Sequence, residues 1–551
     1  MSPRQAARAG RAGRWGLILA FALSIALAGC TLPGRRVESS TATAVGVAVA
    51  SPVGTAATAG SPPPLAAAAP TAATPATPAV ASPRPATPSP TAGTPAAGRG
   101  TASPGGGTPR AGATPTHAPF TATKDEPCHE TELKEAPLPE KPATAATIEQ
   151  AYRCFLLHYV DHNTMDHRVL LNGAWDYLAQ AGQGLFTADD TAPLALTGDR
   201  EADWTVFAGR YNALAKKYSR VDPALLARVT IDGMARSLKD NHVAYLEPPQ
   251  WQRAYAEEVG QNTVIGPGFE IAIDDPTGKF YLHDVYPNTP AAAAGLKAGD
   301  IIVQVGGRPA AKGTGNNALF DLLTGPVGTS ATLQVTRPST GQTVNARVTV
   351  AQVEVPLITS RVLPGGIGYL RLRNFSNNAG EEFDKALAAL QAQGITALIF
   401  DVRQNPGGSV DALKHILSHF THQGPLAVTY DENKKRAEEN PDPSVPLLGL
   451  PWLVLCDNGS ASSSDITSAV AKDRGGHLVG EKSAGALGGA EFYELEDGST
   501  LEITIERVHG PNDEEINEVG VTPDHVVTLT PADLSADNDP QLTHAIAYLT
   551  K

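Results

Sequence analysis

The sequence predicts a multidomain α/β protein that follows a long leader without a fold of its own. Three observations support this class. Residues 31–125 contain almost no large apolar side chains, residues 143–250 repeat apolar residues at helical spacing, and residues 355–535 alternate apolar strand-like runs with amphipathic helices. Between the last two regions, residues 255–352 consist of short β runs separated by Gly and Pro. A chain of 551 residues has room for this arrangement, because domains average about 100–200 residues.

The N-terminus predicts export. Four arginines, Arg4, Arg8, Arg11 and Arg14, precede the apolar run WGLILAFALSIALAG. This run is shorter than the roughly 20 residues of a membrane span. The run ends in Leu27-Ala28-Gly29-Cys30, which resembles a bacterial lipobox. The resemblance implies that residues 1–30 are a lipoprotein signal peptide and that acylated Cys30 anchors the chain to a membrane on its extracytoplasmic side. An ordinary signal peptide or a short anchor is the alternative.

Residues 31–125 predict a disordered tether. They consist mainly of Ala, Thr, Pro, Ser and Gly, which cannot bury enough apolar surface to offset the loss of chain entropy. Such a segment would let the folded part stand away from a membrane or cell wall.

The charge of the chain excludes one class of partner. Its formal net charge is −14, and several of its arginines lie in the leader and the tether. Nucleic-acid binding needs clustered Lys and Arg, so we expect no nucleic-acid partner. The sequence leaves the oligomeric state open.

The four cysteines fall into three groups. Beyond Cys30, an exported chain permits a disulfide between Cys128 and Cys154, which flank the start of the folded region. Cys456 ends the apolar run WLVLC and is predicted to be a small buried side chain. The sequence shows no CxxC pair and no His/Cys cluster with zinc spacing, so we expect no metal site and no cofactor.

Helix signals mark the region of residues 143–250. The segment TIEQAYRCFLLHYVD places apolar residues at helical spacing. The segment DPALLARVTIDGMARSLKD opens with Asp222 as a candidate N-cap and Pro223 at the first helical position, and it stops before DNHVAYLEPP.

Residues 255–352 resemble a PDZ domain. Gly266-Pro267-Gly268-Phe269 occupies the place of the loop that receives a terminal carboxylate, residues 290–295 that of a short helix, and LKAGDII matches a hallmark stretch. The resemblance implies that a peptide end adds as a strand beside FEIAI, with Gly266, Gly268 and Phe269 as the peptide-binding residues. A small β domain that binds nothing is the alternative.

The stretch DNGSASSSDITSAVAKD lies between an apolar strand-like run and a helix-like run. A side chain exposed at a helix N-terminus meets a dipole that favours developing negative charge, as a nucleophile requires. The alternative is that the serines form turns and caps, with Ser463 or Ser464 capping the helix.

This stretch resembles the GSASASE signature of the carboxyl-terminal processing peptidases, and DVRQNPGG is similar to their DLRxNPGG. The order of helical region, PDZ domain and α/β core matches as well. The resemblance implies a crotonase/ClpP-like α/β peptidase core over residues 355–535. It assigns Ser462 as nucleophile and the backbone amides of Gly407, Gly408 and Ser463 as the oxyanion hole.

The general base departs from that pattern. The family's lysine position holds Ala486, with Lys482 nearby and Lys472 expected to be solvated. Asn241-His242-Val243-Ala244-Tyr245 instead resembles the SHAY stretch of the tricorn-core branch, which implies His242 as the base. A loop histidine without a catalytic role is the alternative, and a displaced lysine dyad with Lys482 stays open.

The same branch orients its histidine through a preceding serine and uses a glutamate near GVxPD. Here Asn241 replaces the serine, and INEVGVTPDH supplies Glu518 and, one turn earlier, Glu515 as candidate glutamates, although Asn517 occupies the closest match. Because a free histidine has a pKa near 6.5, this assignment predicts a rate that rises through an apparent pKa near neutrality.

Taken with the leader, the resemblance implies a lipid-anchored serine endopeptidase that cleaves protein substrates received by their C-termini in the PDZ domain. A non-catalytic PDZ-containing binding lipoprotein is the alternative, since the family's lysine is missing. A third hypothesis is a binder of a small hydrophobic ligand.

Overall fold

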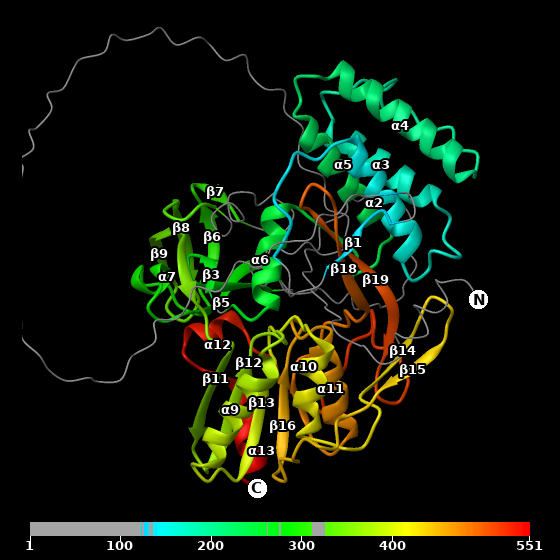
Figure 1. The fold of residues 1–551 in the computed structure, drawn as a ribbon. Coiled ribbons are helices and arrows are strands. Elements are labelled where there is room, and N and C mark those ends of the chain that lie inside the picture. Colours follow the sequence, from blue (N-terminus) through cyan, green and yellow to red (C-terminus); the bar gives the residue numbers. More distant parts are fainter. Residues whose placement is uncertain (1–122, 124–125, 132–135, 262, 275–276, 311–324) are drawn as a thin grey trace, which may run out of the picture.

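The computed structural model describes residues 123, 126–131, 136–261, 263–274, 277–310 and 325–551. The predicted signal peptide, Cys30 and nearly all of the predicted tether lie outside the described residues. The described chain forms a helical part, a β domain and an α/β core, with long strands joining the first to the last (Figure 1). No helix within the described ranges is both long enough and apolar enough to cross a membrane.

The helical part consists of α2 (Ala145–His158), α3 (Arg168–Ala181), α4 (Arg200–Lys217) and α5 (Pro223–Ser237). Helix α5 begins as its sequence predicts, because the Asp222 carboxylate accepts from the backbone of Ala224 at 2.9 Å and Pro223 takes the first helical position. A disulfide joins Cys128 to Cys154 of α2, with their Cα atoms 5.9 Å apart. This pairing confirms the prediction and fixes the start of the described chain to the first helix.

A sheet whose strands come from distant parts of the chain connects the helices to the core. Its order is β1 (His129–Glu130), β18 (Gly489–Glu494), β19 (Thr500–His509), β14 (Ala427–Tyr430) and β15 (Arg436–Glu439), and β2 (Ala244–Leu246) pairs with β19. The register places Leu246 opposite Thr500 and Ala244 opposite Glu502. This pairing carries the chain directly after α5, including His242, onto the α/β core.

The β domain is a five-stranded sheet with one short extra strand. The order is β4 (Phe269–Asp274), β5 (Lys279–Val285), β6 (Ile301–Val305), β8 (Ser330–Arg337) and β9 (Gln342–Thr349), with β7 (Arg308–Pro309) on β6 and the short helix α7 (Pro290–Ala293) after β5. Strand β4 lies at the sheet edge. Helix α6 (Pro248–Glu258) and the pair β3 (Thr263–Gly266) and β10 (Ala351–Glu354) connect this domain to its neighbours.

The core sheet has the order β11 (Ile358–Leu363), β12 (Ile367–Leu372), β13 (Ala397–Asp401), β16 (Trp452–Cys456), β17 (Leu478–Gly480) and β20 (His525–Val526). All pairs are parallel except β11 with β12. Helices α9 (Ala379–Gln391), α10 (Val410–Ser418) and α11 (Ser463–Asp473) cover one face, and α13 (Pro540–Leu549) packs on the other after the short α12 (Pro531–Ser535). The loops that leave β13 and β16 therefore meet at the carboxyl edge of neighbouring parallel strands, where α/β sheets place their sites.

Candidate active site

Ser462 stands at the turn between β16 and α11. Its φ is +53°, a conformation that costs a non-glycine residue free energy and is common at functional sites. Its backbone N–H donates to Asp465 Oδ2 at 2.8 Å and to the carbonyl of Ala486 at 2.9 Å. These bonds hold the Ser462 side chain at the mouth of a pocket.

The neighbouring serines have other tasks. Ser460, Ser463 and Ser468 each donate their hydroxyl to a backbone carbonyl at 2.8 Å, those of Val402, Gly408 and Ser464 respectively. The Ser464 hydroxyl is buried without a partner in the described part of the chain. Helix α11 begins at Ser463, so the residue at the cap position is Ser462 rather than Ser463 or Ser464.

Two glycines bring the loop after β13 against this turn. A Cβ on Gly407 would lie 2.6 Å from Ser462 Cβ, and one on Gly408 would lie 2.6 Å from the carbonyl oxygen of Phe375. Both have positive φ, +105° and +131°, which only glycine adopts without strain. The close approach of the two loops therefore depends on the absence of side chains at these positions.

The backbone amides correct one predicted oxyanion donor. The Gly407 N–H donates to Asn405 Oδ1 at 2.9 Å and is already used. Among the described residues no acceptor pairs with the N–H of Gly408 or with that of Ser463, the first residue of α11. The backbone N–H groups of Gly408 and Ser463 are thus free to donate beside Ser462. Gly407 instead allows the two loops to pack closely.

His242 follows α5 and is fully buried. Its Nδ1 lies 2.7 Å from Asn241 Oδ1, and Asn241 Nδ2 donates to Asn517 Oδ1 at 2.8 Å. The same Asn517 oxygen accepts from the backbone of Leu487 at 3.0 Å, which fixes the orientation of both amides. Nδ1 therefore carries the hydrogen, and Nε2 keeps its lone pair; Nε2 is buried and has no partner within the described residues.

In this arrangement Glu518, the candidate glutamate, does not contact Asn241. Glu518 is exposed, and its backbone N–H donates to the carbonyl of Gly485 at 2.6 Å. The structure brings Asn517, not Glu518, to Asn241. Burial lowers the pKa of His242 to about 4, although nearby Asp240 acts to raise it. With this lowered pKa the ring is neutral at neutral pH, and we expect the apparent pKa of the rate to lie below neutrality.

The segment of residues 483–488 lies between Ser462 and His242. Asp465 accepts from Ser483 Oγ at 2.5 Å, Gly485 N at 3.0 Å and Ala486 N at 3.2 Å. Beyond it, a Cβ on Gly488 would lie 3.1 Å from His242 Cγ. Burial raises the pKa of Asp465 to about 7 against the opposing effect of these hydrogen bonds.

The lysines named from the sequence lie elsewhere. Lys482 is exposed, with its Cε against Gly520, and Lys472 is exposed and donates to the carbonyl of Thr522 at 2.8 Å. Ala486 is buried in the family's lysine position. Lys414 of α10, which the sequence reasoning missed, lines the pocket beside Ser462, with its Nζ 3.9 Å from Glu439.

That pocket is mainly apolar. It opens between Gly408, Ser462 and Gly488, and Lys414, Thr429 and Glu439 are its polar members along with Ser463. The apolar side chains of its wall are Val410, Leu413, Leu426, Ala427, Ile466, Leu487 and Val508.

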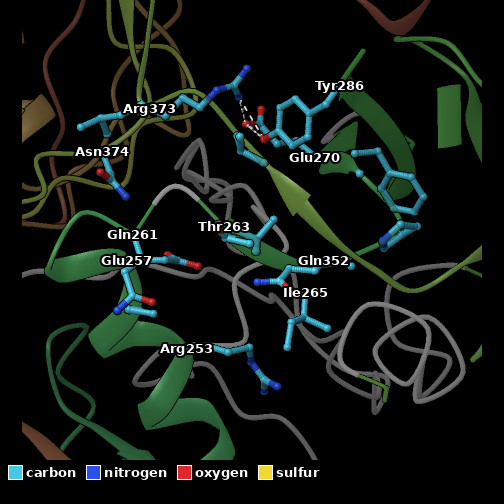
Figure 2. Close-up of a pocket in the computed structure, with 18 of the residues that line it drawn as sticks. Arg253, Glu257, Gln261, Thr263, Ile265, Glu270, Tyr286, Gln352, Arg373 and Asn374 are labelled. Atoms are coloured by element: carbon cyan, nitrogen blue, oxygen red, sulfur yellow. Dashed lines mark hydrogen bonds and ion pairs between the residues drawn. The ribbon is translucent and has the colours of Figure 1, made fainter. Parts of the chain in front are cut away.

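A second, larger cavity of about 600 Å³ joins the β domain to the core. The predicted carboxylate loop, Gly266 to Phe269, lines one side, and Gln404 and Pro406 of the loop after β13 line another. Figure 2 shows Arg253 and Glu257 of α6 along this cavity, and Glu270 with Tyr286 and Arg373 at its far wall. The cavity connects the loop expected to receive a peptide end with the loop that carries Gly407 and Gly408.

Comparison with known proteins agrees with this reading of the two domains. Residues 366–527 match the model of peptidase family S41, and residues 283–337 match a PDZ domain. The chain is 28% identical over 368 residues to the carboxy-terminal processing protease CtpB of Bacillus subtilis (strain 168), covering 64% of this chain and 75% of the relative. It is 28% identical over 394 residues to a carboxyl-terminal-processing protease of Picosynechococcus sp., covering 70% and 90%.

Among solved structures, the photosystem II D1 C-terminal processing protease is similar at 24% identity and a TM-score of 0.46, over 74% of this chain and 97% of that one. The family match covers the strands and loops that hold Ser462, Gly407 and Gly408. The chain thus combines a PDZ domain with a peptidase core of family S41, and it is a serine-type peptidase related to the carboxyl-terminal processing proteases.

Proposed function

We propose that the chain is an endopeptidase in which Ser462 attacks the substrate carbonyl and His242 is the general base. His242 Nε2 takes the Ser462 proton as the Oγ–C bond forms, and the carbonyl oxygen gains negative charge between the N–H groups of Gly408 and Ser463. Each such donor is worth about 3–4 kcal/mol in the transition state. The C–N bond then breaks as Nε2 returns the proton to the leaving amine, and water releases the acyl group by the reverse steps.

The observation that carries this proposal is the state of the His242 ring. Two asparagines, set by the Leu487 backbone, keep the hydrogen on Nδ1 and leave the Nε2 lone pair unused. A buried neutral imidazole with a free nitrogen is what a general base requires. The proposal requires Nε2, which is buried without a partner among the described residues, to come within hydrogen-bond reach of Ser462 Oγ in the complex with substrate.

Labelling with a fluorophosphonate probe tests the nucleophile. Wild type should react, Ser462→Ala should not, and Ser462→Ala should lower the turnover of an unstructured protein by at least about a thousandfold. Ser464→Ala is the matched control, because its buried hydroxyl has no partner to lose. Unchanged labelling of Ser462→Ala, or no labelling of wild type, would contradict the assignment; the second outcome would favour the non-catalytic binding protein.

His242→Gln and Lys414→Met separate the two candidate bases. We expect His242→Gln to lower the rate by several orders of magnitude and Lys414→Met by less than about tenfold, or 1.4 kcal/mol. The reverse result would assign the proton to Lys414 in the pocket wall.

Substrate recognition by the C-terminus is the second part of the proposal. Strand β4 is the edge of the PDZ sheet, so an added peptide strand has backbone groups to pair with. The loop from Gly266 to Phe269 opens into the cavity of about 600 Å³ that reaches Pro406. Arg253 also lines it, and its partly buried guanidinium offers a positive charge to a carboxylate.

The third part is the place of the protein in the cell. We propose that acylated Cys30 anchors the chain on the extracytoplasmic side of a membrane, with residues 31–125 as tether. The lipobox-like Leu27-Ala28-Gly29-Cys30 and a disulfide, which persists in oxidising compartments, support this. Cys30→Ser should move the protein from the membrane fraction to the soluble exported fraction; retention in the membrane would argue for a different anchor.

A further inference from the structure

Two helices of the core bring two histidines and an aspartate together away from the pocket beside Ser462. His415 lies in α10, His419 is its C-cap residue, and Asp384 lies in the neighbouring α9. The two histidines are four residues apart in HILSH, so they share one helix face. The expectation of no metal site rested on the lack of a CxxC pair and of a His/Cys cluster with zinc spacing, which does not cover two histidines joined by an aspartate from another helix.

The geometry of the cluster fits a small metal ion. One ligand atom from each of the three residues lies within 4.8 Å of the other two. His415 Nε2 lies 3.0 Å from Asp384 Oδ2, and His419 Nε2 lies 2.7 Å from Asp384 Oδ1. Ligands held at about 2.0–2.2 Å by tetrahedral zinc are roughly 3.3 Å apart, so small side-chain rotations would open the space.

The environment of His419 suits a metal ligand. Its Nδ1 lies 2.9 Å from the carbonyl oxygen of Pro446, which can only accept, so Nδ1 carries a hydrogen. Nε2 is then the nitrogen that faces the Asp384 carboxylate, and either a proton or a metal ion can lie between these two atoms. A backbone carbonyl that holds the far nitrogen is the usual support of a metal-bound histidine.

We propose that Asp384, His415 and His419 bind a divalent transition-metal ion of the zinc type, with water in the fourth position. Two imidazoles and one carboxylate suit zinc, whereas magnesium and calcium prefer oxygen ligands. His419 is nearly buried, with 9% of its side chain exposed, while His415 at 38% and Asp384 at 46% leave the site open to solvent. An ion can therefore enter without opening the fold.

The ion would fasten α9 to α10. Helix α10 starts at Val410, directly after the glycine loop and its N-cap Ser409, whose hydroxyl accepts from Ala412. Zinc held at the far end of α10 would stabilise the helical layer on which this loop rests. The role is structural, and it does not depend on the proposed function of Ser462.

Gly380 offers a test that leaves all three ligands in place. It lies one turn before Asp384 in α9, and a Cβ there would meet the His415 ring at 2.9 Å. Gly380→Ala should displace His415 while favouring the helix itself by up to about 1 kcal/mol. Lower zinc affinity in this variant would thus come from the site rather than from unfolding.

The experiment is competition for zinc between the purified full-length chain and a chromophoric chelator. Wild type should bind one equivalent tightly, with a thermal midpoint raised by zinc but not by magnesium. His415→Ala, His419→Ala and Asp384→Asn should each weaken binding at least tenfold, and Gly380→Ala should weaken it too. His422→Ala is the matched control, since the His422 ring contacts the carbonyl of Val445 instead of Asp384.

Two results would overturn the proposal. Wild type without a tight equivalent would show that a proton alone holds His419 to Asp384. Equal binding by wild type and the His415→Ala, His419→Ala double variant would place the zinc on other residues.

Discussion

His242 has an asparagine where many serine peptidases place a charged partner. A carboxylate on Nδ1 would stabilise the imidazolium that forms during catalysis and raise the pKa of the ring. Asn241 orients the ring but supplies no charge, so burial dominates and the pKa is lowered to about 4. Asn241 thus orients the ring, while the charge that acts to raise its pKa comes from Asp240, which accepts from the His242 backbone N–H at 3.0 Å.

The first prediction at this scale is a pH profile. We expect kcat/KM to rise with pH through an apparent pKa of about 4 and to be level above pH 6, because the base must be unprotonated. Asn241→Asp should shift this limb to higher pH by placing a carboxylate on Nδ1. An acid limb near pH 7 that Asp465→Asn abolishes would instead report the protonation of Asp465, whose pKa burial raises to about 7.

The same pKa has a consequence for stability. The unfolded chain takes a proton on His242 below its ordinary pKa of 6.5, and the folded chain does so only below about 4. The folded state therefore loses stability as pH falls from 6.5 to 4, by about 3 kcal/mol in total from this group. His242→Gln removes this contribution. As pH falls from 6.5 to 4, the unfolding free energy of wild type should therefore decrease relative to that of the variant.

Single residues show where sequence reasoning reached the site and where it stopped. Ser462 and Gly408 belong to short sequence motifs that can be recognised in a single sequence, and the two residues lie beside each other in the structure. The use of the Gly407 N–H by Asn405 and the contact of Asn517 with Asn241 depend on side-chain directions. Spacing does not encode such directions, so the motif alone does not tell that the amide of Asn517, rather than the carboxylate of Glu518, contacts Asn241.

At the scale of elements, Asp465 ties three segments together. From the first turn of α11 it accepts from Ser462, Ser483, Gly485 and Ala486, so one carboxylate holds the strained turn and the segment below His242. A helix N-terminus also favours negative charge, which offsets part of the cost of burial. Both atoms of the carboxylate are needed, since each oxygen accepts two of the four bonds.

The prediction for this element is the effect of Asp465→Asn. Either orientation of the amide turns an NH₂ group toward a backbone N–H and leaves at least one buried donor unsatisfied, at a cost of about 1–3 kcal/mol. We expect a lower free energy of unfolding and a lower kcat, with the Ser462 turn loosened. Chemical denaturation and turnover measure the two effects, and Asp473→Asn, exposed at the end of α11, is the control. Unchanged kcat in Asp465→Asn would show that the turn keeps its shape without this residue.

Elements with local signals were the predictable ones. Asp222 and Pro223 predict the start of α5, and the short β runs separated by Gly and Pro in residues 255–352 predict a β domain. The sheet that joins β1, β2, β14 and β15 to β18 and β19 has no such signal. Its strands come from four distant parts of the chain, and pairing between them is set by tertiary packing rather than by any local pattern.

At the scale of the molecule, an ionic cluster fastens the PDZ domain to the core. Arg371 of β12 pairs with Glu270 at 3.1 Å and with Asp284 at 2.9 Å. Arg373 pairs with Glu270, with Asp284 at 3.0 Å, and donates to the Tyr286 hydroxyl at 3.0 Å. Although burial acts to raise it, Arg373 and Arg371 hold the pKa of Glu270 well below its usual range. The cluster stays charged at neutral pH.

Arg373 of this cluster lies two residues before Phe375, which pairs with the glycine loop. Phe375 donates its N–H to the carbonyl of Gly407 at 2.7 Å and accepts from Ser409 at 2.7 Å. Glu270 directly follows Phe269 of the predicted carboxylate loop. Covalent bonds and an ion pair therefore connect the loop at Phe269, through Glu270 and Arg373, to Phe375. Phe375 in turn is hydrogen-bonded to the loop that carries the amide of Gly408. Removing one member of a buried ion cluster costs about 3–5 kcal/mol, which is enough to loosen the two domains.

The last prediction compares two substrates that differ only in a free or amidated C-terminus. Wild type should cleave the free form with at least tenfold higher kcat/KM, because the backbone N–H groups of the loop near Gly268 favour a carboxylate. Gly268→Ala, whose Cβ would meet Thr289 at 2.3 Å, should remove the preference and leave turnover of the amidated form unchanged. Arg373→Met should remove the preference and also lower kcat for both forms, since Phe375 loses its support beside Gly407. Equal cleavage of the two substrates by wild type would show that the loop does not read the carboxylate, whereas a preference that survives Arg373→Met would show that the ionic cluster does not carry the signal.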